Sequence, residues 1–374
     1  MANASRGLTR PGESGDSVPW DGRGAESQCW GGCPLARLMG RVLAGRESAD
    51  RVMGEVRTVD VLTEATGIRG PFVGRTFGPM YLPVMFPSNE AFLGVFDADL
   101  ELVRKVLPSD WLHPVRTRPG RAAVGVSGMY FPTHVRPDPA GGQSTCPAYG
   151  EVTIVVLCTP GRPAPPLLPL LEVPSRPGWQ FHVFPVHVPV TTVQAWESGR
   201  MIGNAPKFVA DMDFHLGTRS CVVTLDEGGE RILRLEVRRG GWTQNEDGDL
   251  VFYTVQNEQL VRTCCRVVGT RQTRPGPGGG RLDLGEHPIA DQLRALDVSS
   301  TPLAVRTYLR HSLTLPDGEA IGPARRYDGW LRGEEKEHGT LLVRYDDLPP
   351  IDVNSVVWDH GGDPALPYQT SAAS

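Results

Sequence analysis

Short apolar or alternating segments, separated by glycine- and proline-rich turns, dominate the chain between residues 90 and 316. Such segments are typical of β-strands, because alternate side chains of a strand point to opposite faces of a sheet. Glycine contributes 44 and proline 34 of the 374 residues, which favours many turns and argues against a helical bundle. The segments lie at 90–98, 121–131, 151–158, 180–190, 220–239, 249–255, 260–269 and 302–316.

Sequential strands with few helices predict a mainly β fold (β-rich α+β), in which an antiparallel barrel or folded sheet encloses a cavity. One pair of strands is predicted to form a hairpin that turns at Gly228 and Gly229. Few helices are expected. One follows Asp99, which can cap it, and another has Pro288 in its first turn. The proline-rich residues 161–178 are predicted to be a long loop or lid.

The two ends differ from this central region in composition. We expect residues 1–77 to form an N-terminal extension, disordered over 1–33 and with two weak helical patterns over 34–66. Residues 78–318 form the predicted domain, and residues 319–374 a C-terminal extension.

Charge and hydropathy restrict the partners. The net charge of −5 and the pI of about 6.0 give no bulk attraction to nucleic acid or to anionic membranes, so a small-molecule partner is expected. The sequence has no apolar run of about 18 residues and no apolar stretch typical of a signal peptide, which predicts a soluble, cytoplasmic protein. Seven cysteines at irregular spacing favour reduced thiols.

Lysine is rare in this chain, and one of the three lysines has apolar neighbours. Lys105 and Lys336 have the polar surroundings of surface residues, whereas Lys207 lies between Pro206 and Phe208. A lysine in a desolvated pocket loses its charge easily and becomes a nucleophile, whereas arginine stays protonated. Lys207 is therefore the candidate for forming an imine with a carbonyl compound.

Several blocks of the sequence resemble the acetoacetate decarboxylase family, in the same order along the chain. GRMIGNAPKF (199–208) resembles the family signature, in which Gly-Arg precedes a Pro-Lys-Lys whose first lysine forms the Schiff base. AYGEVTIVV places Glu151 where the family has an active-site glutamate two residues after a tyrosine. EAFLGVFDADLELVRKVLPSDWL resembles the N-terminal strand and helix, and GRLDLGEHPIADQLRAL the closing segment. The resemblance covers roughly residues 78–318.

This resemblance implies a barrel around an apolar pocket, self-association into a homo-oligomer, and roles for four residues. Lys207 would form the imine, and Glu151 would move protons. Arg200 would orient a substrate carboxylate or support Glu151, and Tyr149 is a further substrate-binding candidate. No cofactor and no metal are expected.

The chain also departs from the family pattern. Phe208 replaces the second lysine, Asn89 aligns with an arginine that can hold a substrate carboxylate, and Met201 replaces a glutamate. The strand at 121–131 lacks the acid that the family usually has there. Phe208 and Asn89 are expected to contact the substrate. Imine formation is therefore better supported than decarboxylation.

We expect a Schiff-base-forming lyase that decarboxylates a small β-keto acid. The alternatives are an aldolase, dehydratase or cyclase of secondary metabolism that uses the same lysine, and a non-catalytic barrel that binds an apolar ligand. A metal site is not favoured, because His182 and His187 lie on opposite faces of one strand. The cysteine pairs 29/33 and 264/265 also lack the spacing of a zinc site.

Overall fold

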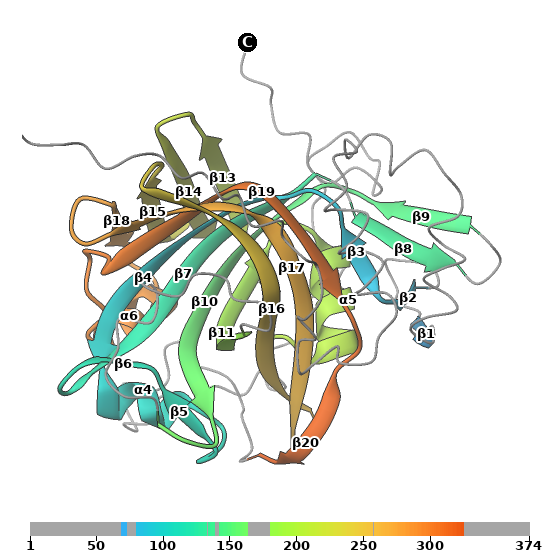
Figure 1. Cartoon of the computed structure of the whole chain (residues 1–374), viewed down its shortest axis with the longest axis horizontal. Coiled ribbons are helices and arrows are strands. Elements are labelled where there is room, and N and C mark those ends of the chain that lie inside the picture. The colour runs from blue at the N-terminus through green and yellow to red at the C-terminus, as the bar shows by residue number, and fades with distance from the viewer. Residues whose placement is uncertain are drawn as a thin grey trace, which may run out of the picture.

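The computed structural model describes residues 69–72, 80–132, 134–138, 142–163, 180–256 and 258–324. Seven strands in these ranges pair into a closed ring (Figure 1). In order around the ring they are β17 (Gln259–Pro275), β16 (Trp242–Gln256), β11 (Gln180–Val190), β10 (Tyr149–Pro160), β7 (Arg121–Phe131), β4 (Glu90–Asp99) and β19 (Ala304–Leu315), which pairs back with β17. All neighbours in the ring are antiparallel except β11 and β16, which are parallel. The predicted barrel-like, mainly β fold is confirmed.

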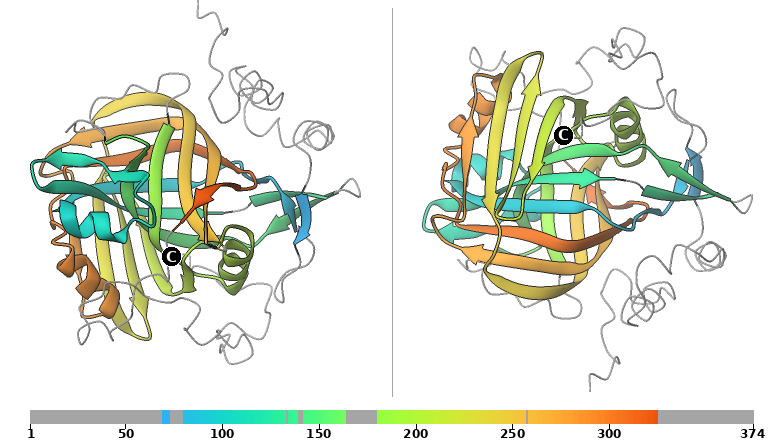
Figure 2. Two further views of the ribbon diagram at one scale, coloured as in Figure 1. Left: turned by 90° about the horizontal axis from the view of Figure 1, so that it is seen from below. Right: turned by 90° about the horizontal axis from the view of Figure 1, so that it is seen from above.

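Shorter strands extend this sheet or lie beside it. They are β1 (Arg69–Phe72), β2 (Met80–Leu82), β3 (Val84–Phe86), β5 (Leu112–Pro114), β6 (Arg116–Arg118), β8 (His134–Asp138), β9 (Gly142–Cys146), β12 (Lys207–Val209) and β20 (Glu319–Pro323). β8 and β9 form a ribbon that projects from the barrel (Figure 2). β20, which lies within the predicted C-terminal extension, pairs with β17. Most of the two predicted extensions, and residues 164–179 of the predicted loop, lie outside the described residues.

A second layer covers the outer face of the barrel. It consists of a four-stranded sheet and a helix: β13 (Asp211–Leu216), β14 (Ser220–Glu227), β15 (Glu230–Arg238), β18 (Gly280–Leu284) and α6 (Pro288–Ala295). Phe92, Val126 and Ile154 of the barrel join one hydrophobic core with this layer. The β14–β15 turn has positive φ at Gly228 (59°) and Gly229 (85°), as a two-residue hairpin loop requires. Both this predicted hairpin and the predicted α6 are confirmed.

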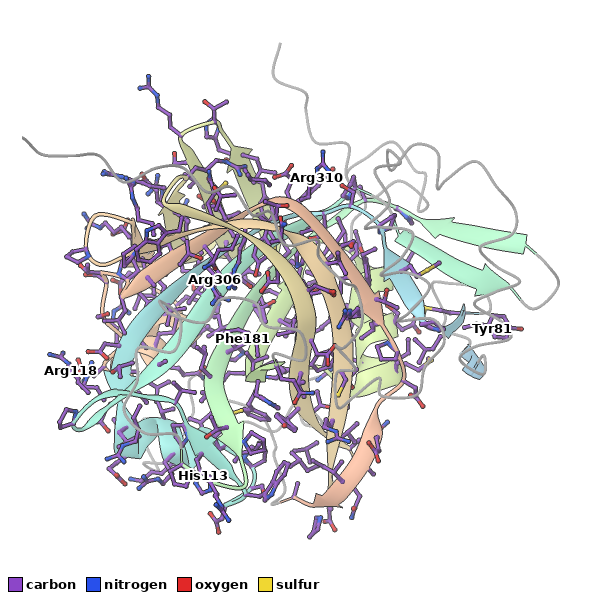
Figure 3. All side chains as sticks on the ribbon, in the orientation of Figure 1. Tyr81, His113, Arg118, Phe181, Arg306 and Arg310 are labelled. Carbon is purple, nitrogen blue, oxygen red and sulfur yellow. The ribbon has the colours of Figure 1, made fainter. Side chains whose placement is uncertain are left out.

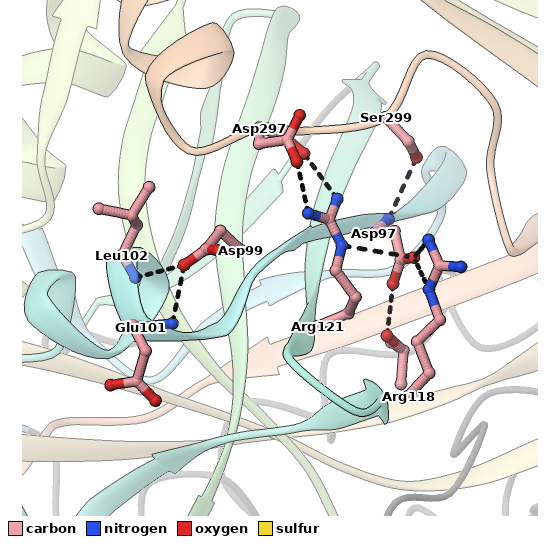
Figure 4. Close-up of polar contacts among 9 residues, drawn as sticks. Asp97, Asp99, Glu101, Leu102, Arg118, Arg121, Asp297 and Ser299 are labelled. Carbon is pink, nitrogen blue, oxygen red and sulfur yellow. Dashed lines mark hydrogen bonds and ion pairs between the residues drawn. The ribbon is translucent and has the colours of Figure 1, made fainter.

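The other predicted helix, α4 (Leu100–Val106), directly follows β4. Oδ1 of Asp99 accepts hydrogen bonds from the amides of Glu101 at 2.9 Å and Leu102 at 3.0 Å, which caps the helix (Figure 4). Next to it, the buried Asp97 pairs with Arg118 at 2.8 Å. The helix buries its apolar face against the outside of the barrel.

The barrel interior is apolar along much of its length. Leu93, Val155 and Val183 belong to one buried cluster inside the ring, because alternate residues of each strand point inward. The guanidinium carbon of Arg306 lies 5.4 Å from the ring centroid of Phe181 (Figure 3). This arginine is 2% exposed and is one of the few charged groups buried in the described part of the chain.

Two further expectations concern thiols and membranes. Cys158, Cys221 and Cys265 are free, but Cys264 is disulfide-bonded, so the expectation of reduced thiols is wrong at that position. None of the helices in the described ranges is long and apolar enough to cross a membrane.

Candidate active site

Lys207 follows a helix that the sequence patterns did not predict. α5 (Val193–Gly203) begins after Thr192, whose hydroxyl oxygen accepts a hydrogen bond from the amide of Ala195 at 3.2 Å. The helix ends at Asn204, which has a left-handed backbone with φ of 45°. The chain then reverses, and Lys207 begins β12, which pairs in parallel with β11. This reversal brings the Lys207 side chain back against α5.

Lys207 and Glu151 form a close ion pair. Nζ of Lys207 lies 2.7 Å from Oε2 of Glu151, and the two side chains are 12% and 11% exposed. The Thr153 hydroxyl donates a long hydrogen bond of 3.4 Å to Oε1 of the same glutamate. Tyr149 and Glu151 are two residues apart on β10 and so point to the same side. The Tyr149 ring centroid lies 5.7 Å from Nζ, so the ammonium faces an aromatic ring as well as a carboxylate.

The ion pair opens into a cavity of about 190 Å³. Most of its wall is apolar and includes Met80, Phe86, Phe131, Val155, Leu250 and Phe252. Phe131 also stacks on Tyr149, with ring centroids 4.8 Å apart. Of the described residues that line the cavity, Lys207 and Glu151 alone carry a formal charge at neutral pH. The Lys207 amine therefore lies at the wall of a largely apolar cavity.

Gly199 makes room for the lysine. A Cβ atom at this position of α5 would lie 2.5 Å from Cδ and 2.6 Å from Cε of Lys207, closer than side chains approach one another. The nearest Lys207 atoms are flexible, so a larger residue would displace the lysine rather than the helix. The glycine of the Gly-Arg pair thus has a specific steric role.

Comparison with known proteins supports the sequence resemblance. The profile of the family described as acetoacetate decarboxylase (ADC) matches residues 70–321. The chain belongs to the acetoacetate decarboxylase family. A comparison with curated proteins finds no match.

Three solved structures are similar to this chain at low sequence identity. The acetoacetate decarboxylase of Legionella pneumophila subsp. pneumophila str. Philadelphia 1 is 16% identical, with 70% of this chain and 96% of that chain covered and a TM-score of 0.48. The enduracididine biosynthesis enzyme MppR, complexed with pyruvate, is 16% identical over 65% of this chain and 91% of that chain, with a TM-score of 0.46. An acetoacetate decarboxylase-like enzyme from Sphingomonas wittichii RW1 is 15% identical over 69% and 100%, with a TM-score of 0.44.

Two residues that the family resemblance suggested for substrate contact lie elsewhere. Phe208 does not line the cavity, contrary to expectation, but packs in the core between the barrel and the second sheet. The reason is the alternation of β12, which turns Lys207 inward and its neighbour outward. Arg200 lies on α5 and is not part of the cavity wall either.

Asn89 also differs from its expected role. It is buried beside the cavity rather than in its wall. Its Oδ1 contacts Nδ1 of His311, and its backbone amide donates a hydrogen bond to the His311 carbonyl at 3.0 Å. His311 itself does line the cavity. Sequence reasoning missed this histidine, although Leu313 and Leu315 follow it at two-residue spacing and line the same cavity. That spacing was the available signal.

The two histidines that the sequence analysis considered, His182 and His187, have separate structural partners. Nδ1 of His182 lies 2.9 Å from the Tyr253 hydroxyl, and Nε2 of His187 lies 2.9 Å from Oε1 of Gln292. Neither histidine lines the cavity. In the part of the chain that the structure describes, no group of three or more histidine, cysteine, aspartate or glutamate side chains is arranged to hold a metal ion.

Proposed function

We propose that this acetoacetate decarboxylase family member is a Schiff-base-forming carbon–carbon lyase. Lys207 is the nucleophile and Glu151 the proton carrier. The observation that supports this most strongly is the 2.7 Å contact between Nζ and Oε2 at the wall of an apolar cavity. Tyr149 contacts the reacting centre through its ring.

The contact between Lys207 and Glu151 allows the proton transfer that must precede imine formation. An ammonium is not a nucleophile, so its proton must leave before the amine attacks a carbonyl carbon. Glu151 can accept this proton directly, because the two groups are already within hydrogen-bond distance. A neutral amine and a neutral acid are also easier to bury than two separate ions. The hydroxyl group of the adduct then takes the proton from Glu151 and leaves as water, which gives an iminium on Lys207 and restores the Glu151 carboxylate.

The iminium determines the reaction class, because it accepts the electron pair released when a bond beta to its nitrogen breaks. With a β-keto acid, the bond to the carboxyl carbon breaks, carbon dioxide leaves and an enamine remains. Glu151 takes up one proton from solvent and transfers it to the enamine carbon, and water then releases the ketone from Lys207. We propose this decarboxylation of a small β-keto acid as the reaction.

The charges of the cavity residues favour a second candidate reaction. The Lys207–Glu151 pair is neutral overall, and a keto-acid anion adds a negative charge for which no further described cavity residue supplies a cation. Burying an unbalanced charge costs on the order of several kcal/mol, unless a proton enters with the anion. An uncharged β-hydroxy ketone avoids this cost. An aldol-type reaction on Lys207 is therefore the second candidate.

Acetoacetate and 4-hydroxy-4-methylpentan-2-one (diacetone alcohol) separate the two reactions. Decarboxylation releases carbon dioxide from the first, and retro-aldol cleavage splits the second into two molecules of acetone. We expect Lys207→Arg to abolish either activity, since a guanidinium stays protonated and forms no imine. A wild-type protein that binds apolar ligands but forms no borohydride-trapped adduct is a binding protein, and this proposal is then wrong.

The family resemblance also leads us to propose a homo-oligomer in solution. Light scattering coupled to size exclusion measures the assembled mass, and a monomer at micromolar concentration contradicts this part of the proposal.

A further inference from the structure

His311 lies in the cavity wall across from the Lys207–Glu151 pair. Glu151 is on β10 and His311 on β19. These strands are separated by β7 and β4 on one side of the ring and by β11, β16 and β17 on the other. Inward-facing residues of β10 and β19 therefore face each other across the interior, and both line the same cavity.

Asn89 fixes which nitrogen of His311 carries the proton. The contact joins Nδ1 of the histidine to Oδ1 of the asparagine, and an amide oxygen can only accept. With the asparagine in this orientation, a neutral ring carries its proton on Nδ1 and presents Nε2 as an acceptor. The structure gives Nε2 no hydrogen-bond partner among the described residues. Nε2 is thus the nitrogen left for a ligand in the cavity.

The surroundings of His311 keep the ring uncharged. The residue is 7% exposed, and burial lowers its pKa to about 4. The aromatic ring of Tyr308 packs against it with centroids 4.4 Å apart. A neutral imidazole in an apolar cavity binds donors such as hydroxyl groups, and it provides no counterion for a carboxylate.

We propose that Nε2 of His311 accepts a hydrogen bond from an O–H on the departing part of the substrate and takes its proton as the carbon–carbon bond breaks. This inference rests on the proposed imine at Lys207. Two substrate types share the required O–H: a β-keto acid bound in its protonated form, and a β-hydroxy ketone. Asn89 is then a positioning residue that acts through the histidine.

The step is balanced in protons and electrons. The bond beta to the imine nitrogen breaks, and its electron pair neutralises the iminium to give the enamine. The O–H proton moves to Nε2, and carbon dioxide or a carbonyl compound leaves. The proton on His311 then passes through water to Glu151, which gave up its own proton to the departing water when the iminium formed. Glu151 donates this proton to the enamine carbon, and hydrolysis of the resulting iminium restores the Lys207 ammonium and the Glu151 carboxylate, so the overall reaction consumes no proton.

The test compares carbon–carbon cleavage with imine formation in the same variants. Cleavage is measured with acetoacetate and with diacetone alcohol, and imine formation by cyanoborohydride trapping of acetone, which has no departing group. We expect His311→Leu to lower the ratio of cleavage rate to trapping rate by about 100-fold for at least one probe, the usual scale for a proton-transfer group. His311→Gln, which retains a hydrogen-bond acceptor but cannot take a proton, should recover less than tenfold of this loss. The probe that is affected identifies the departing group.

His182→Leu is the matched control. His182 is another histidine whose pKa is lowered to about 4 by burial, but it lies outside the cavity, so the ratio should stay within about twofold of wild type. An unchanged ratio in His311→Leu, or an equal loss in the control, overturns the proposal. A wild-type protein that traps acetone but cleaves neither probe also overturns it, and leaves the imine intact. Failure of the wild type to trap acetone instead contradicts the proposed function.

A second measurement uses the wild-type protein and so does not depend on the folding of a variant. Long-range proton–nitrogen NMR correlations report which ring nitrogen of a histidine is protonated. We expect His311 to show a proton on Nδ1 and an unprotonated Nε2. A proton on Nε2 overturns the proposed role as an acceptor.

Discussion

At the scale of single residues, the Lys207 side chain is held between Glu151 and a glycine on the adjacent helix. Nζ lies 2.7 Å from the carboxylate, and the space for its methylene groups exists because Gly199 has no Cβ. Helix and strand thus both set the position of the amine. One substitution tests the role of Gly199, and a second tests the role of Glu151.

Gly199→Ala should move the lysine without harming the fold. The new methyl group would overlap Cδ and Cε of Lys207 and push the amine away from Glu151. We expect imine trapping to slow by about 10- to 100-fold, since misplacement of about 1 Å can cost 10²-fold in rate. The free energy of unfolding should not fall, because alanine favours helices. Gly203→Ala on the same helix, where a Cβ meets no atom within 4 Å, is the control and should trap at the wild-type rate.

Glu151→Gln should separate imine formation from turnover. Glutamine keeps the size of the side chain but cannot carry protons between intermediates. We expect turnover of acetoacetate or diacetone alcohol to fall by about 10²- to 10⁴-fold, while a trapped adduct on Lys207 is still found. Steady-state kinetics and peptide mapping measure the two quantities. Wild-type turnover in this variant rules out Glu151 as the proton carrier.

The sequence predicted part of this site. Lys207, Glu151 and Tyr149 could be named because their spacing follows the family blocks, and the structure places all three together. Phe208 was misplaced because the direction of a three-residue strand is not visible in its own sequence. Asn89 and Arg200 were assigned by alignment alone, which does not show whether a side chain reaches a cavity. His311 lies 104 residues further along the chain than Lys207, and only barrel closure brings it to the site.

At the scale of secondary-structure elements, the connection from α5 to β12 directs Lys207 into the barrel. Asn204 adopts a left-handed backbone at the end of α5, and its Nδ2 donates a hydrogen bond to the Val255 carbonyl at 2.6 Å. The amide of Ala205 donates a hydrogen bond to the Gly199 carbonyl at 3.1 Å, which completes the turn. The cap thus sets the direction in which the chain enters β12.

Substitutions of Asn204 should show both of its roles. Asn204→Gly removes the side-chain hydrogen bond but tolerates the backbone, and should lower the free energy of unfolding by about 1 kcal/mol. Asn204→Ala also places a Cβ in the left-handed region, which costs roughly another 1 kcal/mol. Urea denaturation measures the difference. Equal stability of the two variants would contradict the conformational role.

Elements with a local signal were predicted well, and those without one were not. The β14–β15 hairpin has two adjacent glycines, α4 has an aspartate cap, and α6 has a proline in its first turn. α5 was missed because its sequence, VQAWESGRMIG, contains two glycines and buries only two residues, so its apolar pattern is weak. The parallel pairing of β11 with β16 has no local signal at all.

At the scale of the whole molecule, the barrel closes through pairs of strands that are distant in sequence, such as β4 with β19. Segments in which apolar and polar residues alternate indicate a barrel-like sheet. The order of the strands around the barrel, however, depends on packing between these distant segments. The same closure buries His311 and half-buries His182. The pKa of each is lowered to about 4, mainly by desolvation.

These two histidines predict how stability depends on pH. In the unfolded chain a histidine titrates near pH ~6.5, so between about pH 6.5 and 4 the unfolded state binds protons that the folded state excludes. Stability should therefore be highest above pH 6.5 and fall as the pH decreases to 4, by at most about 3 kcal/mol per histidine. Urea denaturation at several pH values measures this change. His182→Gln should show a shallower decline, and a slope identical to wild type would contradict the assignment.

The central claim is that Lys207 is a reactive amine in an apolar cavity, and adduct mapping by mass spectrometry tests it most directly. The protein is incubated with acetone and cyanoborohydride, and the modified peptides are followed over time. Lys105, which is exposed on α4, is an internal reference in the same sample. The account predicts that Lys207 is modified well before Lys105. Modification of both lysines at the same rate, or of Lys105 alone, would contradict it.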